Sequence, residues 1–216
     1  MLGSTLSAQL ADTSKRHKRP QRLDLDTEQQ EIVPTLLKMA LSRLQTTQYE
    51  AEHFVESAGA ILFQWTTRKI CLAHHQKRDE WLLAKGRRNV GETLQQAAVR
   101  EITEEIGLPC KLLPVTLRTR APPAVEEGYY PDEARVHTDV CEPFMMTCQQ
   151  LGEGRHIRVI MWYIAEVDET AERMEGEENF RAAFFKFDEA LQQLTFQLDR
   201  DIVRKAIEIF EQSYAS

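Results

Sequence analysis

The stretch from Gly86 to Leu108, which reads GRRNVGETLQQAAVREITEEIGL, decides how the rest of the chain is interpreted. A basic, glycine-bearing loop leads into a segment with helical periodicity, which we expect to run from Thr93 to Ile106 and to end at Gly107. One stripe of this helix should pack against a core, because its apolar residues recur at helical spacing: Leu94, Ala98, Val99, Ile102 and Ile106.

Three carboxylates lie close together on this expected helix. Glu101 and Glu105 are four residues apart and Glu104 is three from Glu101, so the side chains leave neighbouring points of one surface. Like charges at this spacing destabilise an isolated helix by roughly 0.2–0.5 kcal/mol per pair. A hard divalent cation, which takes oxygen ligands, would offset the repulsion. The arrangement predicts a metal-dependent enzyme that acts on phosphates.

The composition indicates a soluble globular protein with no membrane partner. The 216 residues are 42% hydrophobic and 28% charged, and no apolar run reaches the roughly 18 residues that a membrane span needs. Residues 1–20 contain no signal peptide, although removal of a leader would leave the same sequence. Four scattered cysteines without a Cys-x-x-Cys pair indicate reduced thiols. We therefore expect a cytoplasmic protein, with the nucleus as the alternative that basic residues 15–19 suggest.

The distribution of charge narrows the class of ligand. The net charge is −7, yet seven basic residues and only two acids lie between Arg68 and Arg88, whereas the run from Glu166 to Glu178 holds seven acids and only Arg173 as a base. A local cationic zone on an acidic protein suits a small polyphosphorylated substrate better than nucleic acid. The sequence gives no indication of an oligomeric state.

The chain divides into three parts by composition and periodicity. We expect a flexible basic arm over residues 1–26, a helical extension over 27–50, and a catalytic domain with a C-terminal helix over 51–216. The domain should alternate strands with helices. Strands are predicted over 57–65 and 69–74, which form a hairpin, and over 80–83, 110–117, 140–148, 156–167 and 183–187. Pro114 should lie at an edge or bulge, and the strand 140–148 lies within an otherwise irregular stretch, 118–155. Helices are predicted over 189–194, capped by Asp188, and over 198–211.

The opening stretch resembles the signature of the Nudix hydrolases. Its pattern is Gly, five residues, Glu, seven residues, then Arg-Glu-apolar-x-Glu-Glu-x-Gly-apolar, and this chain supplies every position: Gly86, Glu92, Arg100, Glu101, Ile102, Glu104, Glu105, Gly107 and Leu108. The resemblance implies an α/β fold, an α/β/α sandwich with a mixed sheet, here with an extra N-terminal and a C-terminal helix. It also implies an enzyme that hydrolyses a phosphoanhydride bond with Mg²⁺ or Mn²⁺.

Roles for individual residues follow from this resemblance. By motif position Glu101, Glu104 and Glu105 would be metal ligands and catalytic together with Arg100, which would orient Glu101. Glu92 would brace the loop, and Gly86 would let the loop pass close to the metals and phosphates. The general base stays open between one of these glutamates and a distant acid, either in the 166–178 run or among Glu126, Glu127, Asp132 and Glu133.

Two substrate classes are consistent with the basic residues. Those expected to bind substrate are Lys85, Gly86, Arg87 and Arg88 in the loop and Arg155 and Arg158 at the start of the 156–167 strand. A dense cationic loop and the order of the later elements resemble the diphosphoinositol polyphosphate phosphohydrolases, so the first expectation is the diphosphate of an inositol pyrophosphate.

The alternative substrate is a diadenosine polyphosphate or another nucleoside diphosphate derivative. In that case Arg87 and Arg88 would pair with surface acids, and adenine would stack on Tyr129, Tyr130 or Trp81. A minor alternative is a Nudix module that binds a ligand without catalysis. Such a module would be expected to lose carboxylates of the signature, and none is missing here.

Overall fold

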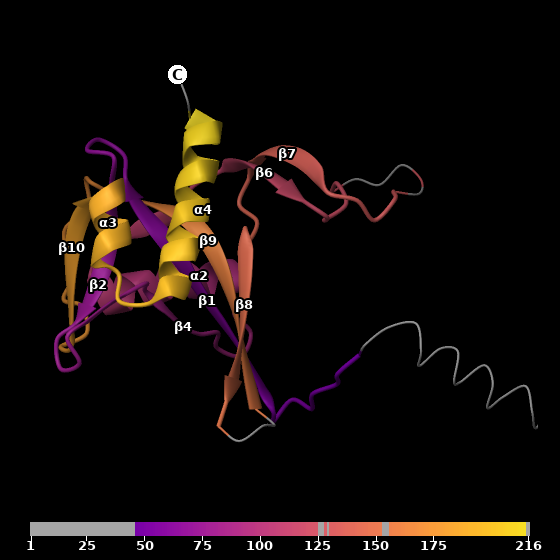
Figure 1. Ribbon diagram of the computed structural model, residues 1–216, viewed down its shortest axis with the longest axis horizontal. Coiled ribbons are helices and arrows are strands. Elements are labelled where there is room, and N and C mark those ends of the chain that lie inside the picture. The colour runs from indigo at the N-terminus through magenta and orange to yellow at the C-terminus, as the bar shows by residue number, and fades with distance from the viewer. Residues whose placement is uncertain (1–45, 125–127, 129, 153–155, 215–216) are drawn as a thin grey trace, which may run out of the picture. The chain divides into compact units, whose positions relative to one another are not determined.

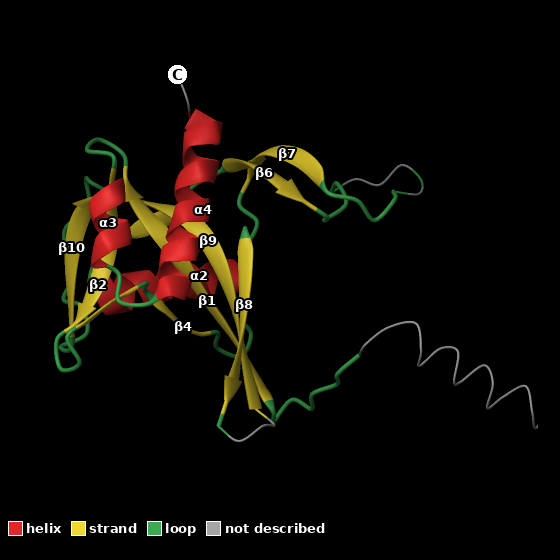
Figure 2. Ribbon diagram, in the orientation of Figure 1, coloured by secondary structure: helices red, strands yellow, loops and turns green. Residues whose placement is uncertain are grey.

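The computed structural model describes residues 46–124, 128, 130–152 and 156–214 (Figures 1 and 2). The chain divides into two units after Gln48, and the second unit begins at Tyr49. The predicted arm, residues 1–26, and most of the predicted helical extension, 27–50, lie outside the described residues. Every further statement about the fold concerns the second unit.

A mixed β-sheet forms the centre of this unit. Strands β1 (Phe54–Gln64) and β9 (His156–Val167) pair in parallel along their length, from Phe54 opposite Ile157 to Phe63 opposite Glu166. The sheet order is β10-β2-β1-β9-β5. Three short or peripheral strands extend it: β3 pairs with β2, β4 pairs with β1, and β8 pairs with β9.

The remaining strands have the following bounds. They are β2 (Lys69–His75), β3 (Glu80–Leu82), β4 (Lys85–Arg87), β5 (Cys110–Leu112), β8 (Met145–Leu151) and β10 (Phe180–Lys186), with β6 (Val115–Thr119) and β7 (Arg135–Val140) forming a separate antiparallel pair. The predicted hairpin is present, because β2 turns back antiparallel onto the end of β1. Strand β4 pairs antiparallel with the beginning of the same strand.

Helices cover both faces of the sheet. Helix α2 (Leu94–Ile106) packs on one face, and α3 (Phe187–Gln193) and α4 (Gln197–Tyr214) pack on the other (Figure 2). Alternate residues of β1 point to opposite faces of the sheet. Ala58, Ala60 and Leu62 pack in the hydrophobic core under α2, whereas Ile61 and Phe63 pack in the core under α4. The predicted α/β/α sandwich with a mixed sheet is thus confirmed.

Local chemistry fixes the ends of α2. Thr93 accepts from the Gln96 N–H while the Gln96 side chain accepts from the Thr93 N–H, which is a capping box. Gly107 ends the helix at φ 71°, in the left-handed region that glycine adopts at little cost, and its N–H donates to the Thr103 carbonyl. Both predicted ends of the helix are therefore correct.

Several predicted elements differ from the structure. The expected strand 110–117 is two strands, β5 and β6, separated at Pro114, and the stretch 118–155 contains β7 as well as β8. The expected strand 140–148 is not continuous, because Val140 ends β7, Met145 begins β8, and Pro143 lies between them. Asp188 does not cap α3: the N-cap is Lys186, because β10 runs directly into the helix. The basic loop contains strand β4.

Two general expectations concern the chain as a whole. All four cysteines are free thiols, as predicted. None of the helices in the described part of the chain has the length and apolarity that a membrane crossing requires.

Candidate active site

Strand β4 brings the glycine of the loop against the carboxylates of α2. Gly86 lies opposite Ala58 of β1, and a Cβ atom placed on Gly86 would come within 1.8 Å of Glu101 Oε2. Cβ atoms in proteins essentially never come closer than 3.0 Å to another heavy atom. Any other residue at this position would therefore have to displace the Glu101 carboxylate. The bare Cα of Gly86 thus sets how near the loop and the helix can come.

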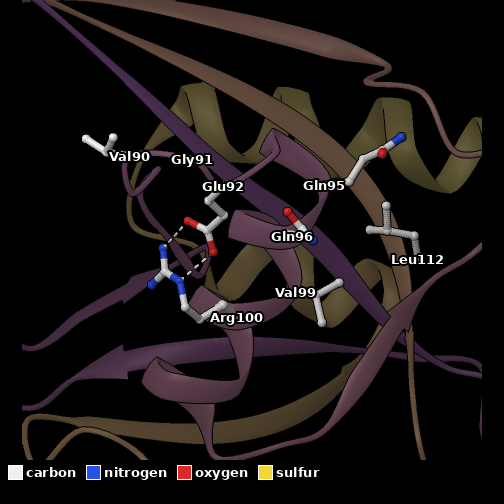
Figure 3. Close-up of a pocket in the computed structure, with 8 residues that line it drawn as sticks. All are labelled: Val90, Gly91, Glu92, Gln95, Gln96, Val99, Arg100 and Leu112. Atoms are coloured by element: carbon white, nitrogen blue, oxygen red, sulfur yellow. Dashed lines mark hydrogen bonds and ion pairs between the residues drawn. The ribbon is translucent and has the colours of Figure 1, made fainter.

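Arg100 holds three carboxylates and the loop together. Its guanidinium forms a two-pronged pair with Glu92, with Nε to Oε1 at 2.8 Å and Nη2 to Oε2 at 2.9 Å (Figure 3). Nη1 donates to Glu101 Oε1 at 2.7 Å and to Glu104 Oε2 at 2.8 Å. Nη2 also donates to the Arg87 carbonyl at 2.9 Å. Charge-assisted bonds of this kind fix side-chain orientation as well as adding stability.

The Glu92–Arg100 pair shifts the pKa of both groups. The hydrogen bond from Arg100, with a second from the Asn89 N–H, lowers the pKa of Glu92 from 4.5 to about 2. Chiefly through Glu92, the pKa of Arg100 rises above its already high usual value. Figure 3 shows this pair at a shallow depression lined by uncharged side chains such as Gln95, Val99 and Leu112. Among the described residues, Glu92 is the only carboxylate that lines this depression, so the depression offers no set of metal ligands there.

A polar cavity of about 370 Å³ lies where the helix carboxylates face β4. We call it the carboxylate cavity; its lining residues are Ser57, Lys85, Gly86, Arg87, Asn89, Glu101, Glu104, Glu105, Arg158 and Glu177. The predicted ligands Glu101, Glu104 and Glu105 are all brought together here, with Glu177 as a fourth acid. Oxygen donors of this kind are those that Mg²⁺ and Mn²⁺ prefer.

Burial changes the ionisation of the helix carboxylates. Glu105 Oε2 accepts from the Lys85 N–H at 3.1 Å, yet burial dominates and raises the pKa of Glu105 to about 7. Burial likewise raises the pKa of Glu101 above its usual range, although Arg100 opposes the shift. Charge on Glu177 raises both values further. A divalent cation would relieve this accumulation of negative charge, and the carboxylates supply the oxygen donors that it takes. Their oxygens do not form a group within 4.8 Å of one another, so binding of an ion would draw the side chains together.

The acidic run after β9 is fastened to the end of α2. The Met174 N–H donates to the Gly107 carbonyl and the Glu177 N–H to the Glu104 carbonyl, both at 2.9 Å. The contact is close, because a Cβ on Gly107 would lie 2.4 Å from the Met174 carbonyl oxygen and one on Gly176 would lie 2.9 Å from that of Glu105. These bonds place Glu177 in the carboxylate cavity.

The other candidates for the general base lie elsewhere. Glu166 pairs with Lys111 at 3.0 Å, and Asp132 pairs with Arg120 at 2.7 Å. Glu133 follows Asp132 just before β7 and does not line the cavity. Glu126 and Glu127 lie outside the described residues. Among the described candidates outside α2, Glu177 alone lines the carboxylate cavity.

The basic residues predicted to bind substrate separate into two groups. Lys85, Arg87 and Arg158 line the carboxylate cavity. Arg88 is directed to Glu56 instead, with Nη2 to Oε2 at 2.6 Å and Nε to Oε2 at 2.8 Å. Arg155 lies outside the described residues.

Sequence reasoning missed two residues of the cavity, Ser57 and Asn89. The Ser57 hydroxyl is buried and has no hydrogen-bond partner among the described residues. The Nε atom of Arg158 is also buried and also has no partner among them. The only sequence signal for Ser57 is a hydroxyl at the start of the apolar run 58–63. A buried polar group without a partner costs free energy, so a ligand or water that bonded to these two atoms would be stabilised in the cavity.

A second cavity of about 360 Å³ adjoins the first, with Lys85 and Arg158 lining both. We call it the α4 compartment; its other lining residues are Arg78, Glu80, Leu82, Thr147, Gln149, Ile160, Trp162, Phe196, Leu198, Asp199 and Ile202. Of the aromatic residues predicted to stack on adenine, Trp81 stacks on His74 at 4.5 Å between ring centroids, and Tyr130 lies beside Arg135. Neither lines the compartment, and Tyr129 lies outside the described residues.

The most compact acidic cluster in the described part of the chain is separate from both cavities. Glu50, Glu52 and His53 place their ligand atoms within 4.8 Å of one another just before β1. Both glutamates are exposed, at 82% and 76% of the side chain, and no buried polar group accompanies them. We assign no role to this cluster.

The fold and the carboxylate cavity together define a class of protein: an α/β/α domain with a carboxylate-bearing helix against a glycine loop. The family model described as NUDIX domain matches residues 53–206. The chain belongs to this family, and the prediction of a Nudix hydrolase is confirmed.

Individual relatives are more distant. An 8-oxo-(d)GTP phosphatase from Mycolicibacterium smegmatis is 35% identical over 86 residues, a match that covers 35% of this chain and 26% of that relative. This chain therefore matches about a quarter of the length of the curated relative.

The solved structures found to be similar share the fold. An Ap4A hydrolase from C. elegans has a TM-score of 0.51 at 14% identity, with 73% of this chain and 98% of that chain covered. A NUDIX hydrolase from Nitrosomonas europaea has a TM-score of 0.46 at 18% identity, with 73% and 88% covered. At these identities the likeness concerns the fold alone.

Proposed function

We propose that this chain hydrolyses a phosphoanhydride bond of a small polyphosphorylated substrate in the carboxylate cavity, with Mg²⁺ or Mn²⁺. The observation that carries the proposal is the convergence of four carboxylates and three cationic side chains on one polar cavity. Phosphoryl transfer requires charge neutralisation and positioning more than covalent chemistry from the protein, and this cavity is equipped for both.

Glu101, Glu104 and Glu105 would hold the cation. When bound, the cation neutralises charge on the phosphate oxygens and lowers the pKa of a water molecule. Arg100 keeps Glu101 and Glu104 oriented through bonds of 2.7 and 2.8 Å.

The remaining residues of the cavity would act on the substrate and the attacking water. Lys85, Arg87 and Arg158 bind phosphate oxygens, and the buried Ser57 hydroxyl donates a further hydrogen bond. Glu177, which the bond to the Glu104 carbonyl positions, accepts the proton of the attacking water.

Of the two substrate classes expected from the sequence, a nucleoside di- or polyphosphate derivative has the better support. The inositol pyrophosphate hypothesis relied on a loop with three available cations, and Arg88 is already bound to Glu56. The α4 compartment beside the phosphate site has a mixed lining, in which apolar side chains such as Phe196 and Leu198 stand beside two acids, Glu80 and Asp199. A fully phosphorylated inositol ring would not contact these groups favourably. The nucleotide named for the M. smegmatis relative agrees with this choice.

A phosphate-release screen tests the proposal. Nucleoside triphosphates, diadenosine polyphosphates, ADP-ribose, capped RNA and diphosphoinositol polyphosphates would be supplied with Mg²⁺, with Mn²⁺, or with EDTA. We expect hydrolysis of a nucleotide substrate that EDTA abolishes. Preferential cleavage of the inositol pyrophosphate would overturn the choice of substrate. Binding without hydrolysis of any substrate would support the ligand-binding module instead.

A further inference from the structure

Strand β8 lies at an edge of the main sheet (Figure 1). It pairs antiparallel with β9 along its whole length, from Met145 opposite Trp162 to Leu151 opposite His156. In the described part of the chain, no further strand pairs with the outer side of β8. The outer side of an edge strand presents backbone N–H and C=O groups with which another strand can pair.

This edge lacks the features that usually prevent pairing between molecules. Edge strands are commonly protected by charged side chains, by proline or by being very short. Strand β8 reads MMTCQQL, which is seven residues without a charge or a proline. The two ends of the main strand order differ from it, because β10 carries Arg181 and Lys186, and β5 has only three residues, one of them Lys111. Strand β8 is thus the edge best suited to accept another strand.

One face of β8 carries an apolar strip to this edge. Met146, Cys148 and Gln150 alternate along the strand, so they share a face, and all three are exposed, Met146 to 58%. Their neighbours on β9 are apolar and only partly buried: Met161, Val159 and Ile157. The strip therefore continues from β9 across β8 and ends in solvent, as is typical of a surface that another chain covers.

The sequence of β8 is complementary to itself. Cys148 is the middle residue of the strand, so a two-fold axis at Cys148 would place a second β8 antiparallel to the first. In that register Met145 lies opposite Leu151 of the second copy, and Thr147 lies opposite Gln149 of the second copy. Apolar side chains then meet apolar ones and polar side chains meet polar ones. No charges repel across the axis, although the chain as a whole carries a net charge of −7.

We propose that β8 is a dimerisation edge, on which a second copy of this chain adds its own β8 and continues the sheet through both subunits. A second copy fits this edge because it presents the same uncharged strand, whereas a charged peptide would leave its charges beside methionine and glutamine side chains. The carboxylate cavity contains no residue of β8, so the dimer does not depend on the proposed function.

Sedimentation velocity of the full chain in the presence of a reductant is the first test. Over roughly 1 to 200 μM, the range in which a modest interface dissociates, the mass should rise from that of one chain toward that of two.

Charge substitutions then locate the interface. Met146→Lys should weaken the dimer by about tenfold or more, because the symmetry repeats each unfavourable contact twice. Val136→Lys is the matched control, since Val136 is 60% exposed in β7, which belongs to the separate strand pair. Gln150→Lys, at the other end of the same face, should act like Met146→Lys. Circular dichroism melting would show that these variants remain folded.

A double variant tests the register. In the proposed dimer position 146 lies opposite position 150 of the second copy, whereas within one chain the two positions are about 14 Å apart. Met146→Lys/Gln150→Glu should therefore recover the dimer that Met146→Lys loses, because charges of opposite sign then face each other across the axis.

Crosslinking provides an independent measure of the same register. A short bismaleimide, which adds one thiol to each of its two ends, should join two wild-type chains through the exposed Cys148. Cys148→Ser should abolish the product, and Cys141→Ser should not. Met146→Lys should lose the product as well, although its Cys148 should still react with a monofunctional maleimide at the wild-type rate.

Three results would overturn the inference. The first is the mass of one chain at every concentration, which would also be found if another part of this chain covers the edge. The second is a dimer that dissociates in Val136→Lys but not in Met146→Lys, because its interface would then lie elsewhere. The third is a double variant that stays as weakly associated as Met146→Lys alone, which would exclude the proposed register.

Discussion

The carboxylate cavity and the α4 compartment adjoin each other but are assembled from the chain in different ways. Residues 85–105 supply most of the carboxylate cavity, to which the fold adds three side chains: Ser57, Arg158 and Glu177. The α4 compartment takes its lining from the region of β3 and β4, from β8 and β9, and from the beginning of α4. Its first and last lining residues, Arg78 and Ile202, are 124 residues apart in the chain. Most residues of the carboxylate cavity are therefore close together in the sequence, whereas the residues that line the α4 compartment are far apart.

This difference predicts that the two cavities can be disabled separately. Changes around α2 should affect turnover with every substrate, and changes in the compartment should affect only substrates with a base. Four further experiments, taken from the largest expected effect to the smallest, test or refine this division.

Glu105→Gln should lower kcat on the order of 10³-fold, because it removes a charged oxygen donor from the metal site. The melting temperature should not fall, since burial that raises the pKa of Glu105 to about 7 means that the ionised carboxylate is costly to bury. Phosphate release and thermal unfolding measure the two effects. Glu175→Gln, an exposed residue of the acidic run, is the matched control. Unchanged turnover in Glu105→Gln would contradict the assignment of the site.

Gly86→Ala should lower kcat by about 10²-fold, because the added Cβ would displace the Glu101 carboxylate. Binding of a nucleoside monophosphate should be affected far less, which separates the two cavities. In the double variant Gly86→Ala/Glu101→Ala the clash is gone, so the melting temperature should recover part of what Gly86→Ala alone loses. A double variant that is less stable than the sum of the single changes would show that the crowding has another origin.

Glu92→Gln should reduce the free energy of unfolding at pH 7 by about 1–3 kcal/mol, the range for hydrogen bonds to charged groups. The pKa of Glu92 is about 2 in the folded protein against 4.5 as its ordinary value. The stabilisation from its charge is therefore fully present above pH 4.5 and disappears as the pH falls toward 2. Urea unfolding at pH 7, 5, 4 and 3 should show the wild type and the variant converging. A difference that is constant across this range would exclude the ion pair as its cause.

The smallest effect contrasts the two adjacent arginines of the loop. Arg87→Ala should raise KM by about three- to tenfold and leave stability unchanged, because Arg87 lines the cavity and is exposed. Arg88→Ala should instead lower the free energy of unfolding by about 1 kcal/mol through loss of the bonds to Glu56. If Arg88→Ala raised KM more than Arg87→Ala, the loop would act as one cationic surface, which would favour the inositol pyrophosphate.

The pattern of residues was sufficient to predict α2 and its carboxylates. Helical spacing alone places Glu101, Glu104 and Glu105 on one surface, and the signals at Thr93 and Gly107 act within one or two turns of chain. The buried strands β1 and β9 are long apolar runs and were also recognised. These features share one property: the interactions that determine them are close in sequence.

Features that depend on distant pairing were not predictable. The separation of Arg87 from Arg88 depends on β4 pairing with β1, where the Arg88 N–H donates to the Glu56 carbonyl at 3.0 Å. Adjacent side chains of an extended segment point to opposite sides, so only one of the two arginines can face the cavity. Similarly, nothing near Asp199 in the sequence indicates that the beginning of α4 lies beside Lys85 and Arg158.

The close contact between Gly107 and Gly176 also constrains how the acidic run can change in length. Because Met174 and Glu177 are bonded to the end of α2, the position of Glu177 is set by the helix and not by the preceding part of the run. Residues could be inserted or deleted around Glu172 without displacing the fourth acid of the cavity. An insertion between Gly176 and Glu177 would displace it. The acidic run can therefore vary in length before Met174, whereas the four residues from Met174 to Glu177 have a fixed length.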